Sequence, residues 1–182
     1  MNLFTDWFNS IAASAVLVGM ALIVLYLIAV CFSWVRFFAF LREKLHTYHL
    51  WLGFLISTGA LISTLIYSQI IAFEPCEFCW WQRVAMYPQV LIFGVALFRR
   101  RLEEYVVLIM LSVIGMVLAV IHISIQLRDD TIFCLPGEVS CSTIYITEFG
   151  FITMPVMSLT VFTILALIAG NGLYEQRKSA RV

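Results

Sequence analysis

Two cysteines separated by two residues, Cys76 and Cys79, lie in a short polar break between two long apolar stretches of the sequence. A C-x-x-C pair either binds a metal ion or carries out thiol–disulfide chemistry. Arg83 follows Cys79 by four residues, so a helix that begins near Cys79 presents both side chains on one face. The free N–H groups at a helix start and a nearby arginine both favour the thiolate, which is the reactive form of cysteine. The spacing therefore predicts a redox pair at a membrane surface, where it can be reached from water and from lipid.

A second pair of cysteines, Cys134 and Cys141, lies in the longest hydrophilic stretch, at about 128–148. The dipeptide Pro136-Gly137 between them is a turn signal that can bring the two cysteines together, and a disulfide between them is geometrically allowed. Two interpretations stay open. The pair is either a structural disulfide in an exposed loop or a second redox pair that exchanges with the first.

Two other side chains are candidates for the same site. His122 lies near the end of an apolar stretch, where a histidine can relay protons, contact a ligand or bond to a neighbouring carbonyl. Arg83 can stabilise a thiolate or a bound anion, or it can extend its charged end to the membrane surface. Cys31 lies alone inside an apolar stretch and is interpreted as a small buried apolar residue.

The composition places these residues in a membrane protein. The chain has 182 residues, of which 63% are hydrophobic and 12% are charged, whereas soluble domains carry about 25% charged residues. Stretches long and apolar enough to cross a bilayer predict five helices, at 11–34, 50–73, 79–98, 105–127 and 151–173. The formal net charge is 0, so the charge balance does not indicate a nucleic acid partner, and none is expected.

The distribution of basic residues predicts the orientation of the chain. Nine of its 11 lysine and arginine residues fall on one side of the predicted helices, and two, Arg83 and Arg128, fall on the other. Because the side richer in lysine and arginine faces the cytoplasm, the N-terminus and both cysteine pairs are expected outside and the C-terminus inside. The sequence thus predicts an all-α membrane protein with five spans.

Two segments resemble a known family. The stretch Cys76–Pro88, CEFCWWQRVAMYP, resembles the signature of the DsbB family of disulfide bond formation proteins, and in particular its BdbC-like branch. The stretch Glu148–Leu159, EFGFITMPVMSL, resembles the same branch. The resemblance covers about 48–175 and implies a four-helix transmembrane bundle there. An additional N-terminal transmembrane helix and a basic cytoplasmic loop precede the bundle at 1–47, and a cytoplasmic tail follows it at 176–182.

The resemblance also implies an activity. Members of the family reoxidise a DsbA-like thioredoxin-fold partner and pass the electrons to membrane quinone, here ubiquinone or menaquinone. Carried over to this sequence, Cys76 and Cys79 would be the quinone-coupled pair, and Cys134 and Cys141 would be the pair that oxidises the partner.

Further roles follow from the same resemblance. Cys79 would form the thiolate that interacts with quinone, assisted by Arg83, and His122 falls where the family can carry a histidine near the quinone. Cys134 would form the mixed disulfide with the partner. The implied location is the bacterial cytoplasmic (inner) membrane, with the cysteine loops facing the periplasm or the cell exterior. The chain departs from the family pattern in its additional first span and in its short second cysteine loop.

Three other functions stay open on the sequence alone. A reductive thiol enzyme, or one resembling vitamin K epoxide reductase, would use the same thiol chemistry with another substrate or direction. A metal-binding membrane protein would close a tetrahedral zinc site with the four paired cysteines. A structural membrane protein would use both cysteine pairs only as disulfide staples.

Overall fold

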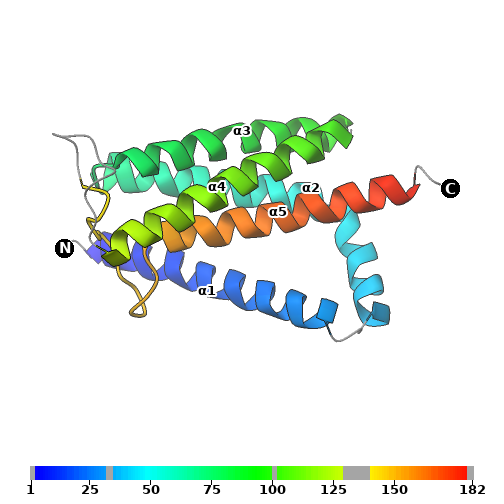
Figure 1. Ribbon diagram of the computed structural model, residues 1–182, viewed down its shortest axis with the longest axis horizontal. Coiled ribbons are helices and arrows are strands. Elements are labelled where there is room, and N and C mark those ends of the chain that lie inside the picture. The colour runs from blue at the N-terminus through cyan, green and yellow to red at the C-terminus, as the bar shows by residue number, and fades with distance from the viewer. Residues whose placement is uncertain (1–2, 32–34, 100–101, 129–139, 180–182) are drawn as a thin grey trace.

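The computed structural model describes residues 3–31, 35–99, 102–128 and 140–179. Its helices are α1 (Leu3–Cys31), α2 (Val35–Leu65), α3 (Glu77–Arg99), α4 (Leu102–Arg128) and α5 (Met154–Ser179), with a π-helical turn, η1 (Ile66–Ile70), at the end of α2. Figure 1 shows α3, α4, α5 and the later part of α2 as a bundle of roughly parallel helices, with α1 along one side of it, whereas the first part of α2 runs across the bundle axis near the end of α1. Within the described residues, extended pairing is limited to one isolated bridge, between Glu148 and Ile152. The predicted all-α membrane fold is confirmed.

Among the described residues, four helical segments are long and apolar enough to cross a membrane by themselves: Leu3–Ile28, Tyr48–Ile70, Glu103–Arg128 and Met154–Lys178. The fifth predicted span corresponds to α3, whose 23 residues extend over about 34 Å at 1.5 Å per residue. This helix is less apolar because it carries polar side chains, but these are buried inside the protein: Gln82, Arg83 and Gln89.

The first helix extends further toward the N-terminus than the sequence predicted. It begins at Leu3 rather than at residue 11, and Asp6 lies in its first turn. An acidic side chain in the first turn is favoured by the helix dipole, so the charge that was taken to precede the span instead lies inside the helix. Similarly, α2 begins at Val35, and the basic segment before residue 48 is part of that helix.

The core of the bundle is apolar and closely packed. Around the bundle, α2 contacts α3, α3 contacts α4, α4 contacts α5 and α5 contacts α2, while α1 packs mainly on α5. Phe162 of α5 is fully buried, and a Cβ atom at Gly115 of α4 would overlap its ring. Small residues of this kind let membrane helices approach closely. Between α3 and α4, the Ser112 hydroxyl donates a hydrogen bond of 2.9 Å to Oε1 of Gln89.

The helix directions bring both cysteine loops to one end of the molecule. The start of α1, the segment 71–76 before α3 and the loop 140–153 before α5 lie together at that end, and the C-terminal end of α5 lies at the other (Figure 1). The loops that carry the candidate residues are therefore neighbours, although they are distant in the sequence.

Candidate functional site

A distorted helix end leads into the first cysteine pair. In η1 the Ile71 amide bonds to the Ile66 carbonyl at 2.9 Å, which is the i→i+5 spacing of a π-helix. Ala72 then takes a positive φ of 61°, and the Phe73 amide bonds back to the Tyr67 carbonyl at 2.9 Å. This turn ends the helix and directs the chain back toward the bundle, where α3 begins one residue after Cys76.

The two sulfurs of the C-x-x-C pair face each other. Cys79 lies in the first turn of α3, as predicted, and its Sγ is 3.1 Å from Sγ of Cys76 in a dithiol pair. Cys76 is only 4% exposed. Its hydrogen bond to Cys79 and its burial raise the pKa of the Cys76 thiol to about 12, although His122 acts in the opposite direction. Cys76 is therefore a protonated hydrogen-bond donor near neutral pH, and Cys79 is its acceptor.

His122 of α4 lies on the Cys76 side of the pair. Its Nδ1 is 3.3 Å from the Gln82 amide nitrogen, and its Nε2 is 3.1 Å from the Cys141 carbonyl oxygen. An amide nitrogen donates and a carbonyl accepts, so this arrangement places the imidazole proton on Nε2. The same nitrogen is 3.7 Å from Sγ of Cys76. His122 thus links the two cysteine loops and directs a donor at the Cys76 sulfur.

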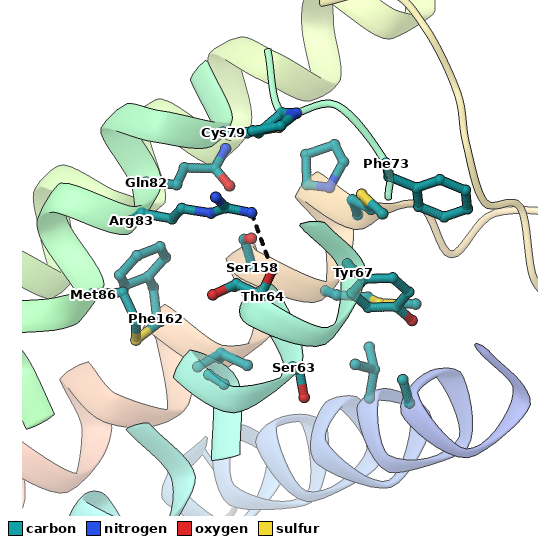
Figure 2. Close-up of a pocket in the computed structure, with 18 of the residues that line it drawn as sticks. Ser63, Thr64, Tyr67, Phe73, Cys79, Gln82, Arg83, Met86, Ser158 and Phe162 are labelled. Carbon is teal, nitrogen blue, oxygen red and sulfur yellow. Dashed lines mark hydrogen bonds between the residues drawn. The ribbon is translucent and has the colours of Figure 1, made fainter. Parts of the chain in front are cut away.

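Arg83 points into the protein rather than to the membrane surface. It is 8% exposed, and its guanidinium donates a hydrogen bond of 3.1 Å to the Thr64 carbonyl of α2 (Figure 2). The Ser68 hydroxyl donates to the same carbonyl at 3.0 Å, next to the π-helical turn. The guanidinium carbon is also 5.1 Å from the centre of the Trp80 ring, within the range of a cation–π contact. The interfacial interpretation of Arg83 was therefore wrong.

A largely apolar cavity of about 380 Å³ adjoins Cys79 and Arg83. Ligand pockets usually occupy about 300–1,000 Å³. In Figure 2, Cys79, Gln82 and Arg83 lie along the α3 side of the cavity, and Phe162 closes it from α5. The other sides are mostly apolar, and Ser63, Thr64 and Ser158 add hydroxyl groups there. A lining of this kind suits a flat apolar ligand that carries hydrogen-bond acceptors.

The second cysteine loop packs on the first. Cys141 is 1% exposed and belongs to a buried cluster with Cys76 and Ile125 of α4, with Cys79 at its edge. Farther along both loops, the rings of Phe73 and Tyr145 stack at 4.8 Å with an angle of 19° between their planes.

Cys134 lies outside the described residues, so its pairing with Cys141 stays a prediction. The structure brings Cys76, Cys79, Arg83, His122 and Cys141 to one site.

Comparisons with known proteins agree with the motif around Cys76. The profile of the family described as "Disulfide bond formation protein DsbB" matches residues 46–171. The chain belongs to the DsbB family. Its membership confirms the resemblance stated from the sequence and makes the chain a membrane thiol–disulfide oxidoreductase.

Three relatives illustrate the match. "Probable disulfide formation protein C 2" of Bacillus cereus is 34% identical over 128 residues, which cover 69% of this chain and 91% of the relative. The "SPbeta prophage-derived disulfide bond formation protein B" of Bacillus subtilis is 39% identical, over 71% of this chain and 86% of the relative. "Disulfide bond formation protein C" of the same organism is 36% identical, over 65% and 87%. No solved structure matches the chain at a significant level.

Several residues of this DsbB-family site were not singled out from the sequence. Gln82 orients His122, Thr64 accepts from Arg83, and Tyr145 holds the second loop on Phe73. Gln82 carried a usable signal, because it is a polar side chain one helical turn after Cys79. Thr64 acts through its backbone, and Tyr145 resembles any aromatic residue at a membrane boundary. Neither residue could therefore be recognised from the sequence.

Proposed function

We propose that this DsbB-family protein reoxidises a DsbA-like thioredoxin-fold partner and passes the electrons to membrane quinone, either ubiquinone or menaquinone. One observation carries the proposal: the C-x-x-C pair lies between two different surroundings. On one side Cys79 and Arg83 line an apolar cavity, and on the other Cys76 packs against Cys141 of the second loop. A pair in this position can take electrons from the second loop and release them toward the lipid phase.

The thiol steps balance as two successive exchanges. The two thiols of the partner reduce the Cys134–Cys141 disulfide, which leaves a disulfide in the partner and two thiols in the second loop. These thiols then reduce the Cys76–Cys79 disulfide. Each exchange proceeds by thiolate attack through a mixed disulfide and transfers two electrons and two protons. Quinone supplies the final acceptor for the two electrons and two protons that leave the Cys76–Cys79 dithiol.

The residues around the first pair give its two sulfurs different tasks. The raised pKa of Cys76 keeps its thiol protonated, so that it can donate to Cys79. A negative charge that forms on the pair is then favoured on Cys79, which lies at the start of α3, where the helix dipole stabilises it. The Nε2 proton of His122 faces Cys76 and stabilises that sulfur when it becomes the leaving group of an exchange. Cys79 is then the sulfur that reacts in the cavity, and Cys76 is the one that reacts with the second loop.

The cavity fits a quinone by its chemistry. Quinone oxygens accept hydrogen bonds, and the Arg83 guanidinium retains donors beyond the one it gives to Thr64. The apolar walls, which include Met86, Val161 and Phe162, suit the faces of a planar ring. Arg83 would hold the polar edge of the ring beside Cys79, and the apolar walls would exclude water from it.

The cellular location proposed is the bacterial cytoplasmic (inner) membrane, with the cysteine loops facing the periplasm or the cell exterior. Disulfides persist in oxidising compartments, and nine of the 11 lysine and arginine residues fall on the side of the predicted spans opposite to the cysteine loops. We assign the catalytic bundle to residues 48–175, the additional helix and basic segment to 1–47, and the tail to 176–182.

A metal site is the second candidate, because one observation favours it. The donor atoms of Cys76, Cys79 and His122 all lie within 4.8 Å of one another. Two thiolates and an imidazole are zinc ligands, and three protein ligands leave one position open. Metal analysis of the purified reduced protein separates this candidate from the oxidase. A stoichiometric metal that is lost in Cys79→Ser would favour the metal site.

The test of the oxidase is quinone reduction by the purified protein in detergent, driven by a reduced thioredoxin-fold oxidase and followed by quinone absorbance. Cys76→Ser and Cys79→Ser should reduce turnover to background, because neither can re-form the disulfide. Cys31→Ser is the matched control, since Cys31 belongs to neither pair, and it should retain wild-type turnover. Arg83→Ala should raise the KM for quinone while the thiol exchange with the partner is unchanged.

The possible outcomes are distinct. Full turnover in Cys79→Ser would contradict the proposed path. An absence of turnover in the wild-type protein, with both a benzoquinone and a naphthoquinone, would contradict quinone as the acceptor. Oxidation of the protein by the partner, rather than the reverse, would favour a reductive enzyme.

A further inference from the structure

One wall of the cavity comes from a helix that the DsbB-family profile does not cover. The profile matches residues 46–171, whereas α1 spans Leu3–Cys31. Three α1 side chains line the cavity together with Cys79 and Arg83: Ala12, Ala15 and Val16. Figure 2 shows α1 passing along the side of the cavity that lies opposite α3.

Contacts at three levels hold α1 against the bundle. Near its start, the Phe8 ring packs edge-on against Tyr67 at 5.1 Å. In the middle, a Cβ atom at Gly19 would meet Cδ1 of Ile164 in α5 at 3.0 Å, so the glycine permits a close approach. Further along, the Tyr26 hydroxyl donates to Oδ1 of Asn171 in α5 at 3.2 Å. The position of α1 is therefore fixed by contacts on either side, along the helix, of the residues that line the cavity.

The side chains of α1 differ between the cavity side and the lipid side. The side chains that line the cavity include two alanines, which are too small to fill it. On the lipid side, Ile11, Val18 and Leu22 are exposed on the surface. Ala15 lines the cavity and is also exposed, so it lies where the cavity opens. On this side of the cavity, which α2 and α5 also line, α1 lies between the cavity and the lipid.

We propose that α1 is a selectivity wall for the lipid-soluble electron acceptor, and that the small side chains at Ala12 and Ala15 set the size of the ring that reaches Cys79 and Arg83. This inference rests on the proposed function, because it assigns that acceptor to this cavity. It adds an entry route past Ala15 and a role for α1 in binding. Replacing Ala15 by a larger residue should narrow the opening of the cavity without changing the cysteines.

The experiment compares Ala15→Phe with Ala21→Phe, since Ala21 is an exposed alanine of the same helix that does not line the cavity. Two measurements are made on full-length protein in detergent: quinone turnover, and covalent labelling by a photoreactive quinone with the labelled peptides identified by mass spectrometry. Ala15→Phe should raise the quinone KM at least about tenfold, as added bulk in a ligand pocket does, with little change in kcat. Wild-type protein should be labelled on α1, and Ala15→Phe should lose that label.

Controls separate the possible failures. Ala21→Phe should match the wild type in both measurements, and a single-turnover thiol exchange with the partner, without quinone, should be unchanged in both variants. If Ala15→Phe does not fold, Ala15→Val provides the same test with a smaller rise in KM. Wild-type turnover with unchanged KM and labelling in the Ala15 variants would overturn the role of α1 but leave the proposed function intact. Neither turnover nor labelling in the wild type would overturn both.

Discussion

Cys76 and Cys79 have unequal surroundings although only two residues separate them. Cys76 is buried between Cys141 and His122, and it donates to Cys79. Cys79 lies at a helix start and lines the cavity. When one thiol stays protonated and donates a hydrogen bond to the other, negative charge is favoured on the sulfur that accepts the bond. In the proposed function, this asymmetry would give electron transfer a direction, from the second loop to the cavity.

The raised pKa of Cys76 makes a testable prediction about pH. Because burial and the hydrogen bond to Cys79 raise this pKa to about 12, the thiolate fraction of Cys76 should increase about tenfold per pH unit from pH 7 to pH 10. Initial rates of iodoacetamide modification, measured at Cys76 by mass spectrometry on fully reduced protein, should follow that slope.

The reference for this measurement is the cysteine of a short unstructured peptide. With an ordinary thiol pKa of about 8.5, its modification rate should level off above about pH 9.5. If the Cys76 rate levels off in the same way, Cys76 is not the donor of the pair.

The sequence predicted part of this site and missed the rest. A C-x-x-C followed by an arginine after four residues was enough to place Cys79 at a helix start with Arg83 on the same side. The burial of Cys76 could not be predicted, because it depends on Cys141 and His122, which come from distant segments. Pairing between segments that are far apart in sequence is decided by tertiary packing, and local patterns do not encode it.

Among the helices, the contact between α4 and α5 depends on a missing side chain. Gly115 lies against the Phe162 ring, which is fully buried and also lines the cavity. Packing at this contact therefore sets both the separation of the two helices and one wall of the site. The sequence shows the glycine, but only the structure shows which ring occupies the space beside it.

Substitution of Gly115 should destabilise the bundle. In Gly115→Ala the new Cβ overlaps the Phe162 ring, and overpacking of this kind costs about 1–3 kcal/mol. Gly170→Ala in α5 is the control, because nothing lies within 4 Å of a Cβ atom there, and it should be at least as stable as the wild type. Unfolding in mixed detergent–SDS micelles measures both. Equal stability of the two variants would contradict the close packing of α4 on α5.

Two features of the helices had no sequence signal. The π-helical turn of η1 arises within an uncharged stretch, Ile66–Ile70, that contains no proline or glycine. At the far end of the bundle, His49 is 6% exposed, and its Nε2 is 2.8 Å from the Tyr105 hydroxyl. A single histidine near a span end looks the same in sequence whether it is buried or not, because its partner is on another helix.

For the molecule as a whole, the helix directions separate two chemically different ends. One end carries both cysteine loops, and the other carries Arg99, Arg177 and Lys178 at the ends of α3 and α5. This separation could be predicted from sequence, because it requires only the order of the spans and the positions of the charges. The place of α1 against the cavity could not, since it depends on side-chain packing.

The orientation is testable with two single-cysteine variants made in a background without native cysteines. A membrane-impermeant maleimide applied to intact cells should label Phe149→Cys, which is an exposed position in the loop 140–153. It should label Lys178→Cys only after the cells are permeabilised, because the basic end is predicted to face the cytoplasm. The reverse pattern would contradict the predicted orientation.

The stack of Phe73 on Tyr145 has a consequence for the kinetics of the enzyme. These rings join the two loops through apolar contact, so the loops do not need a covalent bond to stay together. When every cysteine is reduced, Cys141 therefore remains beside Cys76 at a high effective concentration, as tethered groups do. In the proposed function, exchange between the loops would therefore be first order in the enzyme and would not slow on dilution, whereas the encounter with a diffusing thiol partner would.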